Sequence, residues 1–281
     1  MSQRKKRRLV SFLIRRVTSP MRVLPDFLII GFHKCGTTSL YDHLCRHPHI
    51  APAFNKEIHF FERRYLRGEY WYRAHFPTVF KKWVRQGHFL TGEASPGTVF
   101  NPRSAERVKR TVPGARMIVL MRNPVDRAFS HYQHNLRNPR AMKNELPTFE
   151  QAVEEDDARW AAELKGLEKE ARKMDRRYLA FACLARGRYA EHLEPWLSAF
   201  PKDRFYFIKA EEMFERTEGI VSEALRFLGL SDLHQKEYPR LNEGRYAEKM
   251  RPDTRKKLLD YYRPHNEKLS RLLGRDFSWN E

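Results

Sequence analysis

The feature that most constrains this chain is an apolar run that passes through a glycine-containing turn into a helical pattern. Residues 25–30, with the sequence PDFLII, are typical of a buried strand. The turn GFHKCGTT follows at residues 31–38, and apolar residues at helical spacing continue until Pro48. Strand, glycine turn and helix form the opening unit of a nucleotide-binding α/β sheet. The pattern predicts a parallel sheet of the phosphate-loop type, flanked by helices, in a single domain.

The turn has the spacing of a loop that binds phosphate. Backbone N–H groups at a helix N-terminus, together with the helix dipole, attract an anion. In the metal-dependent loop GxxxxGK[ST], however, the lysine follows the second glycine. Here Thr37 stands at that position, and the lysine, Lys34, lies inside the loop. The loop is therefore predicted to bind phosphate or sulfate without the usual metal–phosphate apparatus, and no metal site is predicted.

A second strand and helix are predicted further along the chain. Residues 115–121 (ARMIVLM) form the clearest apolar run, and Asn123-Pro124 then starts a helix with proline at its first position. Because parallel strands present their carboxyl ends at one crevice, we expect residues 31–38 and 122–130 to line the same cleft.

Composition and charge narrow the class of protein. With 41% hydrophobic residues the chain is globular, and its net charge of +19 favours polyanionic partners such as nucleotide phosphates, nucleic acid, acidic membranes or acidic glycans. Residues 1–22 hold eight of the lysines and arginines and no acid. Residues 1–23 are therefore expected to form a basic N-terminal arm before a domain at 24–281. We expect this arm to be solvated, and a helix at a membrane surface is the alternative.

The cysteine content and the apolar runs of the sequence indicate in which cellular compartment the protein resides. The chain has three cysteines without CxxC spacing, which argues against a disulfide framework or a zinc site. The apolar stretch at residues 9–14 is far shorter than the ~20 residues that span a bilayer, and no signal peptide is evident. The simplest compartment is the reducing cytoplasm.

Several segments together resemble the sulfotransferases that use 3′-phosphoadenosine 5′-phosphosulfate (PAPS). FLIIGFHKCGTTSLYDHL at 27–44 is similar to the 5′-phosphosulfate loop of that family, and ARMIVLMRNPVDRAFSHYQH at 115–134 is similar to its 3′-phosphate segment. NKEIHFFE at 55–62 and GEASPGTVF at 92–100 resemble stretches of the heparan sulfate sulfotransferases. The resemblance covers about residues 24–281. It implies an enzyme that transfers a sulfuryl group from PAPS to a hydroxyl or amine without a metal.

The resemblance also assigns residues to the donor. Lys34 would neutralise charge on the bridging oxygen, and the loop amides with the threonine hydroxyls would hold the 5′-phosphosulfate. Arg122 and Ser130 match the pair that holds the 3′-phosphate, and Gly244 with Arg245 keeps part of the family's C-terminal nucleotide loop. The predicted donor-binding residues are Lys34, Cys35, Gly36, Thr37, Thr38, Ser39, Arg122, Ser130, Gly244 and Arg245.

A second set of residues is predicted to be catalytic: Glu57, Lys34, His59 and His134. Glu57 matches the glutamate base of the heparan sulfate enzymes, and such a base needs a raised pKa or a tightly fixed position. His59 could orient this base or the acceptor, and His134 matches a histidine of the N-sulfotransferase branch. The sequence pattern alone leaves plain alternatives open. Glu57 could be a surface carboxylate paired with Lys56, His59 a packed loop residue, and His134 a solvated helix residue.

The sequence does not identify the acceptor, and it leaves two alternative classes of protein to consider. The resemblance implies a carbohydrate or glycolipid acceptor. The missing membrane anchor and cysteine pair of the animal enzymes make the chain look like a soluble, bacterial-type relative. The first alternative is a small-molecule kinase with a phosphate loop, which the position of Lys34 and the pair Arg122 and Ser130 disfavour. The second is a basic nucleic-acid-binding protein, suggested by the isoelectric point near 10.0. Because no compact nucleic-acid motif is found, we expect no nucleic-acid partner.

Overall fold

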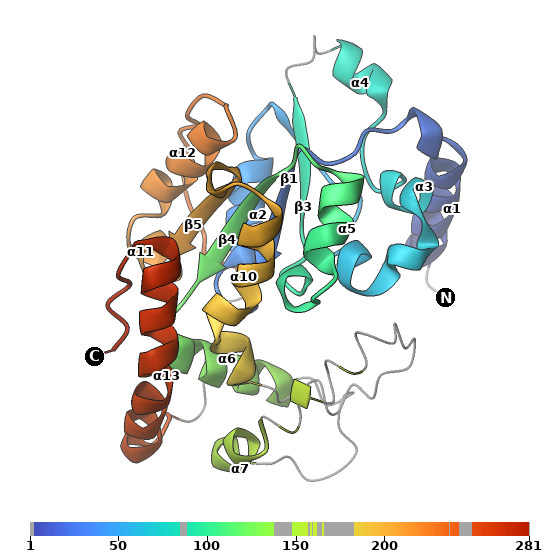
Figure 1. Ribbon diagram of the computed structural model, residues 1–281. Coiled ribbons are helices and arrows are strands. Elements are labelled where there is room, and N and C mark those ends of the chain that lie inside the picture. The colour runs from blue at the N-terminus through green and yellow to red at the C-terminus, as the bar shows by residue number, and fades with distance from the viewer. Residues whose placement is uncertain are drawn as a thin grey trace.

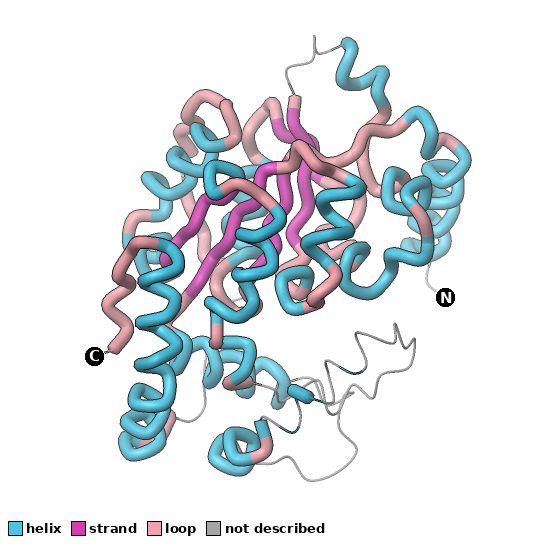
Figure 2. The backbone as a smooth tube through the Cα atoms, viewed as in Figure 1, coloured by secondary structure: helices cyan, strands magenta, loops and turns pink. Residues whose placement is uncertain are grey.

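A five-stranded parallel sheet organises the part of the chain that the structure describes (Figures 1 and 2). The structure is a computed structural model, and it describes residues 3–84, 89–137, 148–156, 158, 160–161, 165, 183–235, 237–241 and 249–280. The strand order is β2-β3-β1-β4-β5, and every neighbouring pair runs parallel. The strands are β1 Phe27–Gly31, β2 Ile50–Pro52, β3 Leu90–Ala94, β4 Arg116–Met121 and β5 Phe205–Lys209.

Helices cover both faces of the sheet. The α-helices are α1 Gln3–Val17, α2 Thr37–Cys45, α3 Glu69–Arg73, α4 Val79–Val84, α5 Ser104–Thr111, α6 Pro124–Leu136, α7 Phe149–Glu154, α10 Tyr189–Ala199, α11 Ala210–Glu215, α12 Thr217–Phe227 and α13 Pro252–Leu273. Shorter helical turns are η1 Ser19–Met21, η2 Phe60–Arg64, η3 Tyr65–Arg67, η4 Thr98–Phe100, η6 Ala185–Gly187 and η7 Lys202–Arg204. Figure 1 shows α5 and α10 in front of the strands and α2 behind them.

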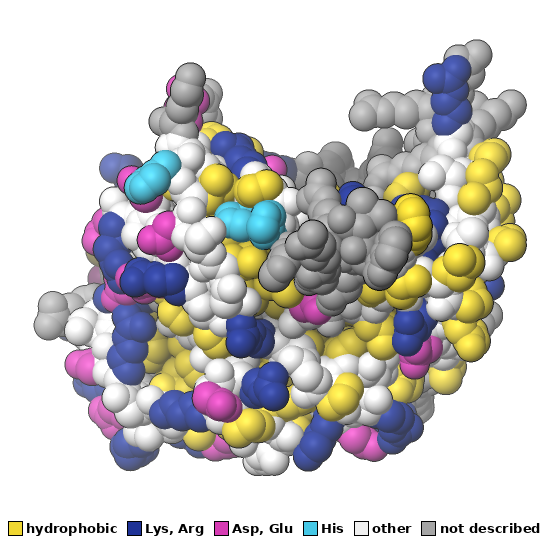
Figure 3. Space-filling view, turned by 90° about the horizontal axis from the view of Figure 1, so that it is seen from above, with side chains coloured by type: hydrophobic (Ala, Val, Ile, Leu, Met, Phe, Trp, Pro, Cys, Tyr) yellow, Lys and Arg dark blue, Asp and Glu magenta, His cyan; other side chains and the backbone are white. Residues whose placement is uncertain are grey.

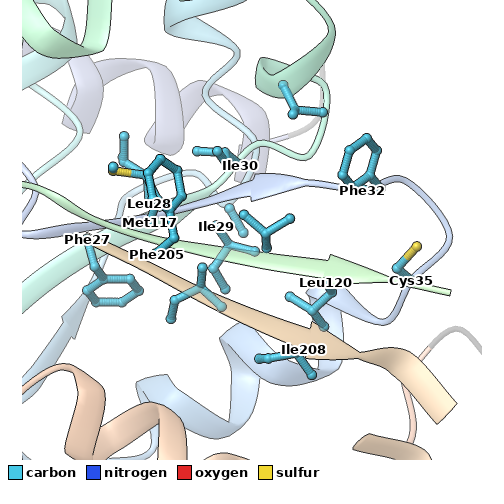
Figure 4. Close-up of a cluster of buried hydrophobic side chains, with 14 of the residues drawn as sticks. Phe27, Leu28, Ile29, Ile30, Phe32, Cys35, Met117, Leu120, Phe205 and Ile208 are labelled. Atoms are coloured by element: carbon cyan, nitrogen blue, oxygen red, sulfur yellow. The ribbon is translucent and has the colours of Figure 1, made fainter. Parts of the chain in front are cut away.

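The central strands are buried on both faces, which is why they read as unbroken apolar runs in the sequence. All five residues of β1 are buried, and so are the last five residues of β4. Figure 4 shows side chains from β1, β4 and β5 packed together, with Phe32 and Cys35 at the end of the sheet where β1 enters the turn. The parallel α/β fold predicted from the sequence is confirmed.

The order of the strands brings the two predicted nucleotide segments together. β1 and β4 are direct neighbours in the sheet. The backbone N–H of Phe32, directly after β1, donates a hydrogen bond of 2.7 Å to the carbonyl oxygen of Leu120 in β4. The turn after β1 and the start of α6 after β4 therefore lie at the same edge of the sheet, as the sequence predicts.

The segment at residues 53–68, whose charged residues are typical of a loop, is partly helical. Phe60 and Phe61 are buried in the π-helical turn η2, and the 3-10 turn η3 follows it. The ring of Phe60 stacks on Tyr72 of α3, with the ring centroids 4.2 Å apart. Contacts between rings distant in sequence therefore order a segment whose charged residues suggested an exposed loop.

The N-terminal segment, expected to be solvated, forms α1 and packs against the domain. The ring of Phe12 lies 5.7 Å from that of Phe54 and 4.8 Å from that of His75. The Arg15 guanidinium donates hydrogen bonds of 2.6 Å to the carbonyl oxygen of Ala74 and 2.7 Å to that of Phe76. These carbonyls follow the end of α3, where carbonyl groups lack intrahelical partners. One arginine thus joins α1 to the domain.

The segment at residues 143–175, whose polar, charge-mixed composition is typical of a surface excursion or lid, lies largely outside the described residues. Its described part includes α7, which starts with a capping box between Thr148 and Gln151. Phe149 and Ala152 of α7 are buried in a cluster with residues of α6 and α13 such as Tyr132. At least α7 therefore belongs to a packed core.

Close packing between β1 and β3 leads to a stability prediction. A Cβ atom on Gly92 would lie 2.5 Å from Cζ of Phe27, a fully buried residue. Gly92→Ala should therefore lower the free energy of unfolding by about 1–3 kcal/mol, the usual cost of overpacking. At Gly114 nothing lies within 4 Å of such a Cβ, so Gly114→Ala is the matched control. Urea unfolding curves check this, and equal stability of the two variants would show that the β1–β3 contact is looser than described.

Candidate active site

The turn between β1 and α2 needs a special backbone. Gly36 is the N-cap of α2 and has a left-handed conformation with φ of 88°. A Cβ atom there would also lie 3.1 Å from the ring of Phe214. Only glycine meets both demands without strain. Lys34, earlier in the turn, also has a positive φ of 69°, so the loop reverses direction before the first N–H groups of α2.

Positive charge gathers at this turn. Burial lowers the pKa of the Lys34 ammonium, and the nearby guanidinium groups of Arg122 and Arg137 lower it further. In the described part of the chain, no carboxylate forms an ion pair with Lys34 or Arg122. Cations that repel one another at a helix N-terminus favour an anion between them. The structure therefore places two of the predicted donor residues, Lys34 and Arg122, near each other.

The other predicted donor residues occupy varied positions around this turn. Thr37 and Ser130 are buried, at the start of α2 and within α6. The Ser39 hydroxyl accepts a hydrogen bond of 2.9 Å from the backbone N–H of Leu241, which fixes the chain next to residues 242–248. The predicted residues Gly244 and Arg245 fall in that segment and lie outside the described residues.

Cys35 is the residue of the loop that precedes Gly36. Its thiol is fully buried, and this burial raises its pKa to about 12. A thiol with that pKa is not a nucleophile at neutral pH, so Cys35 can contact a donor only through its backbone. Cys35, Cys45 and Cys183 are all free thiols.

A row of contacting side chains with alternating charges lies beside the loop. The ammonium of Lys56 donates hydrogen bonds of 2.8 Å to Oγ1 of Thr38 and 2.9 Å to Oε1 of Glu57. Nε2 of His59 lies 3.5 Å from Oε2 of Glu57, and Nδ1 of His59 lies 2.7 Å from Oε1 of Glu62. Glu57 thus lies between Lys56 and His59, contacts both, and keeps 42% of its side chain exposed, whereas Glu62 is buried.

These contacts set the protonation states of Glu57 and His59. The hydrogen bond from His59 outweighs burial and, with Lys56, lowers the pKa of Glu57 to about 2. Burial opposes a charge on His59, but hydrogen bonds to Glu57 and Glu62 outweigh it and raise its pKa to about 9. At neutral pH Glu57 is therefore a carboxylate and His59 an imidazolium. Of the two properties expected of a glutamate base, the structure shows the fixed position and not the raised pKa.

His134 lies on the exposed side of α6, near both parts of the site. Burial lowers its pKa, the charges of Lys34 and Arg137 lower it further, and Glu57 raises it. The imidazole therefore lies within electrostatic range of the anion loop and of Glu57. It is neutral at pH 7 and can accept a proton.

Comparison with known proteins identifies this arrangement. Residues 24–271 match the model of the family described as sulfotransferase domain.

The chain belongs to the sulfotransferase family.

Similar proteins include three named sulfotransferases. Heparan sulfate glucosamine 3-O-sulfotransferase 3B1 of Mus musculus is 30% identical over 92% of this chain and 65% of its own length. The membrane-associated sulfotransferase kil1 of Dictyostelium discoideum is 27% identical over 94% of this chain and 68% of its own length. The bifunctional heparan sulfate N-deacetylase/N-sulfotransferase 3 of Mus musculus is 31% identical over 90% of this chain, which spans only 30% of that protein.

A solved structure supports the same assignment. The crystal structure of a sulfotransferase from Alicyclobacillus acidocaldarius superposes with a TM-score of 0.69 at 27% identity, covering 92% of this chain and 100% of that one. The predicted enzyme class, a PAPS-dependent sulfotransferase, is confirmed. Among the residues the structure describes, no helix is both long and apolar enough to cross a membrane.

The sequence did not single out two buried carboxylates of this sulfotransferase. Glu62 accepts a hydrogen bond of 3.0 Å from Oγ1 of Thr98 and orients His59. Glu93 accepts hydrogen bonds of 2.7 Å from the Tyr72 hydroxyl and 2.6 Å from the Ser95 hydroxyl. The spacing of three residues between His59 and Glu62 was a signal in the sequence that the two side chains could pair. Glu93 had no local signal, because its partner Tyr72 lies 21 residues away.

Glu93 fixes the chain segment that carries the proposed base. Oε2 of Glu93 lies 3.4 Å from the backbone nitrogen of Ile58, and Oγ of Ser95 accepts a 3.1 Å hydrogen bond from the backbone nitrogen of His59. Burial raises the pKa of Glu93 to about 7, against the hydrogen bonds that it accepts, and the nearby charge of Glu62 adds to the rise. Glu93 therefore keeps its proton in the folded state at pH values where an unfolded glutamate has lost it.

The raised pKa of Glu93 predicts a pH dependence of stability. Between pH 4.5 and about 7 the unfolded chain loses this proton while the folded chain retains it, so stability falls as pH rises through this window. Glu93→Gln should remove that fall, which amounts to at most about 3 kcal/mol. Urea unfolding of both proteins at a series of pH values measures the difference. Parallel curves for the two proteins would show that Glu93 titrates normally when folded.

Proposed function

We propose that this sulfotransferase transfers a sulfuryl group from PAPS to a hydroxyl or amine of a carbohydrate or glycolipid, with Glu57 as general base. The observation that carries the proposal is a pair of cations without ion-pair partners in the described chain, Lys34 in the turn before α2 and Arg122 directly after β4. An anionic donor would relieve their repulsion. The carboxylate of Glu57 is connected to Thr38 of α2 through hydrogen bonds from Lys56, and we propose that it accepts the proton of the acceptor.

The phosphosulfate of the donor would bind at the first turn of α2. Backbone N–H groups of residues 35–38 and the hydroxyls of Thr37 and Thr38 are the proposed donors to its oxygens. Lys34 would lie against the bridging oxygen. Because the Ser39 hydroxyl already bonds to backbone groups, we propose that it positions the neighbouring chain as well.

The 3′-phosphate of the donor would bind near the carboxyl end of β4. Arg122 and Ser130 are the residues proposed to contact it, and this phosphate distinguishes PAPS from ATP. Gly244 and Arg245 stay predictions for the same phosphate.

The proposed reaction is one in-line displacement. The acceptor oxygen or nitrogen bonds to sulfur as the bond from sulfur to the bridging phosphate oxygen breaks. Adenosine 3′,5′-bisphosphate leaves with that electron pair, and the proton of the acceptor passes to Glu57. Lys34 stabilises the charge that grows on the leaving oxygen, and His59 keeps Glu57 in position. His134, a neutral imidazole nearby, is the proposed second base.

The acceptor class is proposed from the relatives. Two of them carry heparan sulfate in their names, one as a 3-O-sulfotransferase and the other as an N-sulfotransferase. A carbohydrate is therefore the proposed acceptor, and no nucleic-acid partner is proposed. The cytoplasm is the proposed compartment, because free thiols such as Cys35 and Cys183 suit a reducing environment.

Contact between the N-terminal segment and a membrane surface is also proposed. Its basic character attracts anionic surfaces, and the relative kil1 is named as membrane-associated.

The proposal as a whole is tested by transfer of labelled sulfate. The purified chain, incubated with labelled PAPS and a panel of glycans, glycolipids and phenols, should label at least one carbohydrate. Label on phenols alone would contradict the proposed acceptor, and no label on any acceptor would contradict the proposed reaction.

Arg122→Ala should weaken donor binding selectively. Each charge-assisted hydrogen bond to the 3′-phosphate contributes about 1.5–3 kcal/mol, so the dissociation constant for PAPS should rise about tenfold or more. Adenosine 5′-phosphosulfate, which lacks the 3′-phosphate, should be affected far less. Arg116→Ala, at the opposite end of β4, is the matched control. Titration calorimetry measures both ligands, and equal losses for both would exclude Arg122 as the residue that recognises the 3′-phosphate.

Glu57→Gln should separate turnover from donor binding. The amide keeps the shape of the side chain but cannot accept the acceptor's proton, so kcat should fall about 10²–10⁴-fold. The affinity for PAPS should barely change, since other residues hold the phosphates. Glu69→Gln, which alters an exposed carboxylate on α3, is the control. Near-normal turnover of Glu57→Gln would assign the proton transfer elsewhere, with His134 the next residue to replace.

A further inference from the structure

Helix α1 turns an apolar face toward solvent. Its contacts with the domain run through Phe12 and Arg15 on one side of the helix. The opposite side carries five large side chains at helical spacing, which therefore share one stripe. Their exposed fractions are Leu9 51%, Val10 56%, Leu13 55%, Ile14 60% and Val17 83%.

Arginines border this stripe on both edges. At 3.6 residues per turn the five side chains cover about 140° of the helix circumference. Arg16 lies next to Leu9 at one edge, and Arg7 lies next to Ile14 at the other, both exposed. Apolar residues flanked by cations are the pattern of a helix that lies in the plane of a membrane interface.

Neighbouring elements also carry exposed apolar side chains. Met21 of η1, Leu66 of η3 and Tyr70 of α3 are 59%, 78% and 64% exposed. α1 contacts both η1 and α3, and α3 contacts η3. Figure 3 shows hydrophobic side chains gathered along the edge of the molecule where α1 and α3 lie, with Lys and Arg side chains beside them.

The distribution of exposed apolar side chains sets this surface apart. Of the eleven large hydrophobic side chains that are exposed in the described part of the chain, ten belong to residues 9–80. The remaining one, Leu241, is 37% exposed. Single exposed hydrophobic residues are ordinary, but a contiguous group marks a surface that another body covers.

The positive charge of the protein favours a membrane over a second copy of the chain as the body that covers the stripe. Two copies would bring their basic α1 helices together on proteins that each carry a net charge of +19, and the resulting repulsion opposes association. An anionic bilayer attracts the same arginines and accepts the apolar stripe.

We propose that α1 docks this sulfotransferase onto an anionic lipid bilayer. Leu9, Leu13 and Ile14 enter the boundary between headgroups and acyl chains, while Arg7 and Arg16 contact the lipid phosphates. The inference gives a structural basis to the proposed membrane contact and does not depend on the proposed sulfuryl transfer.

Vesicle flotation with the full chain tests the proposal. The chain should float with vesicles of phosphatidylcholine and phosphatidylglycerol and remain unbound with phosphatidylcholine alone. The double variant Leu13→Ser/Ile14→Ser should lower the partition onto anionic vesicles about tenfold or more, because two buried apolar side chains are lost. Arg7→Gln and Arg16→Gln should each lower it about fivefold. Leu241→Ser, an apolar-to-polar change outside this surface, should bind as the unchanged chain does.

Two results would overturn the proposal: failure of the unchanged chain to bind anionic vesicles, or equal binding by the Leu13→Ser/Ile14→Ser variant. Sedimentation of the unchanged chain as a dimer, with the double variant as a monomer, would assign the stripe to a second copy instead. Circular dichroism confirms folding of each variant. Turnover of the double variant on a water-soluble acceptor should match that of the unchanged chain, so vesicle binding and sulfuryl transfer are judged separately.

Discussion

The parallel pairing of β1 with β4 is the interaction on which the rest of the site depends. It places the ends of both strands at one edge of the sheet and so brings the cationic side chains of Lys34 and Arg122 near each other. The helix N-terminus that Gly36 opens adds its own positive potential. In the described chain no carboxylate neutralises these groups, so the folded protein favours an anion there. This arrangement is the basis on which we propose that the donor binds there.

The opposite side of the site consists of a fixed carboxylate. Glu57 is held by Lys56 and His59, and Glu93 holds the backbone beneath them. With a pKa near 2, Glu57 is ionised throughout the physiological range, and its affinity for a proton is low. As the proposed base, Glu57 would act through its position, because the acceptor group becomes acidic only as its oxygen or nitrogen bonds to sulfur. Lys56 contacts both Thr38 and Glu57, so one side chain connects the proposed donor loop with the proposed base.

The sequence predicts the donor side of the site better than the acceptor side. β1, its turn and β4 carry local signals, namely continuous apolar runs and a glycine at the start of a helix. Glu93 could not be found in this way, because its role arises from contacts with Tyr72 and the backbone of Ile58, which are remote in sequence. Similarly, α1 was expected to be solvated because its charges dominate its composition, and the contacts of Phe12 and Arg15 show that it is attached to the domain.

The most direct test of the central claim is the binding of adenosine 3′,5′-bisphosphate, followed by titration calorimetry in a chelator that removes divalent metals. The arrangement of Lys34 and Arg122 at a helix N-terminus predicts tight binding of this nucleotide without metal. It also predicts that ATP, which lacks the 3′-phosphate, binds at least about tenfold more weakly under the same conditions. Equal binding of the two nucleotides, or binding of either only when magnesium is restored, would contradict the assignment of this site to a sulfuryl donor.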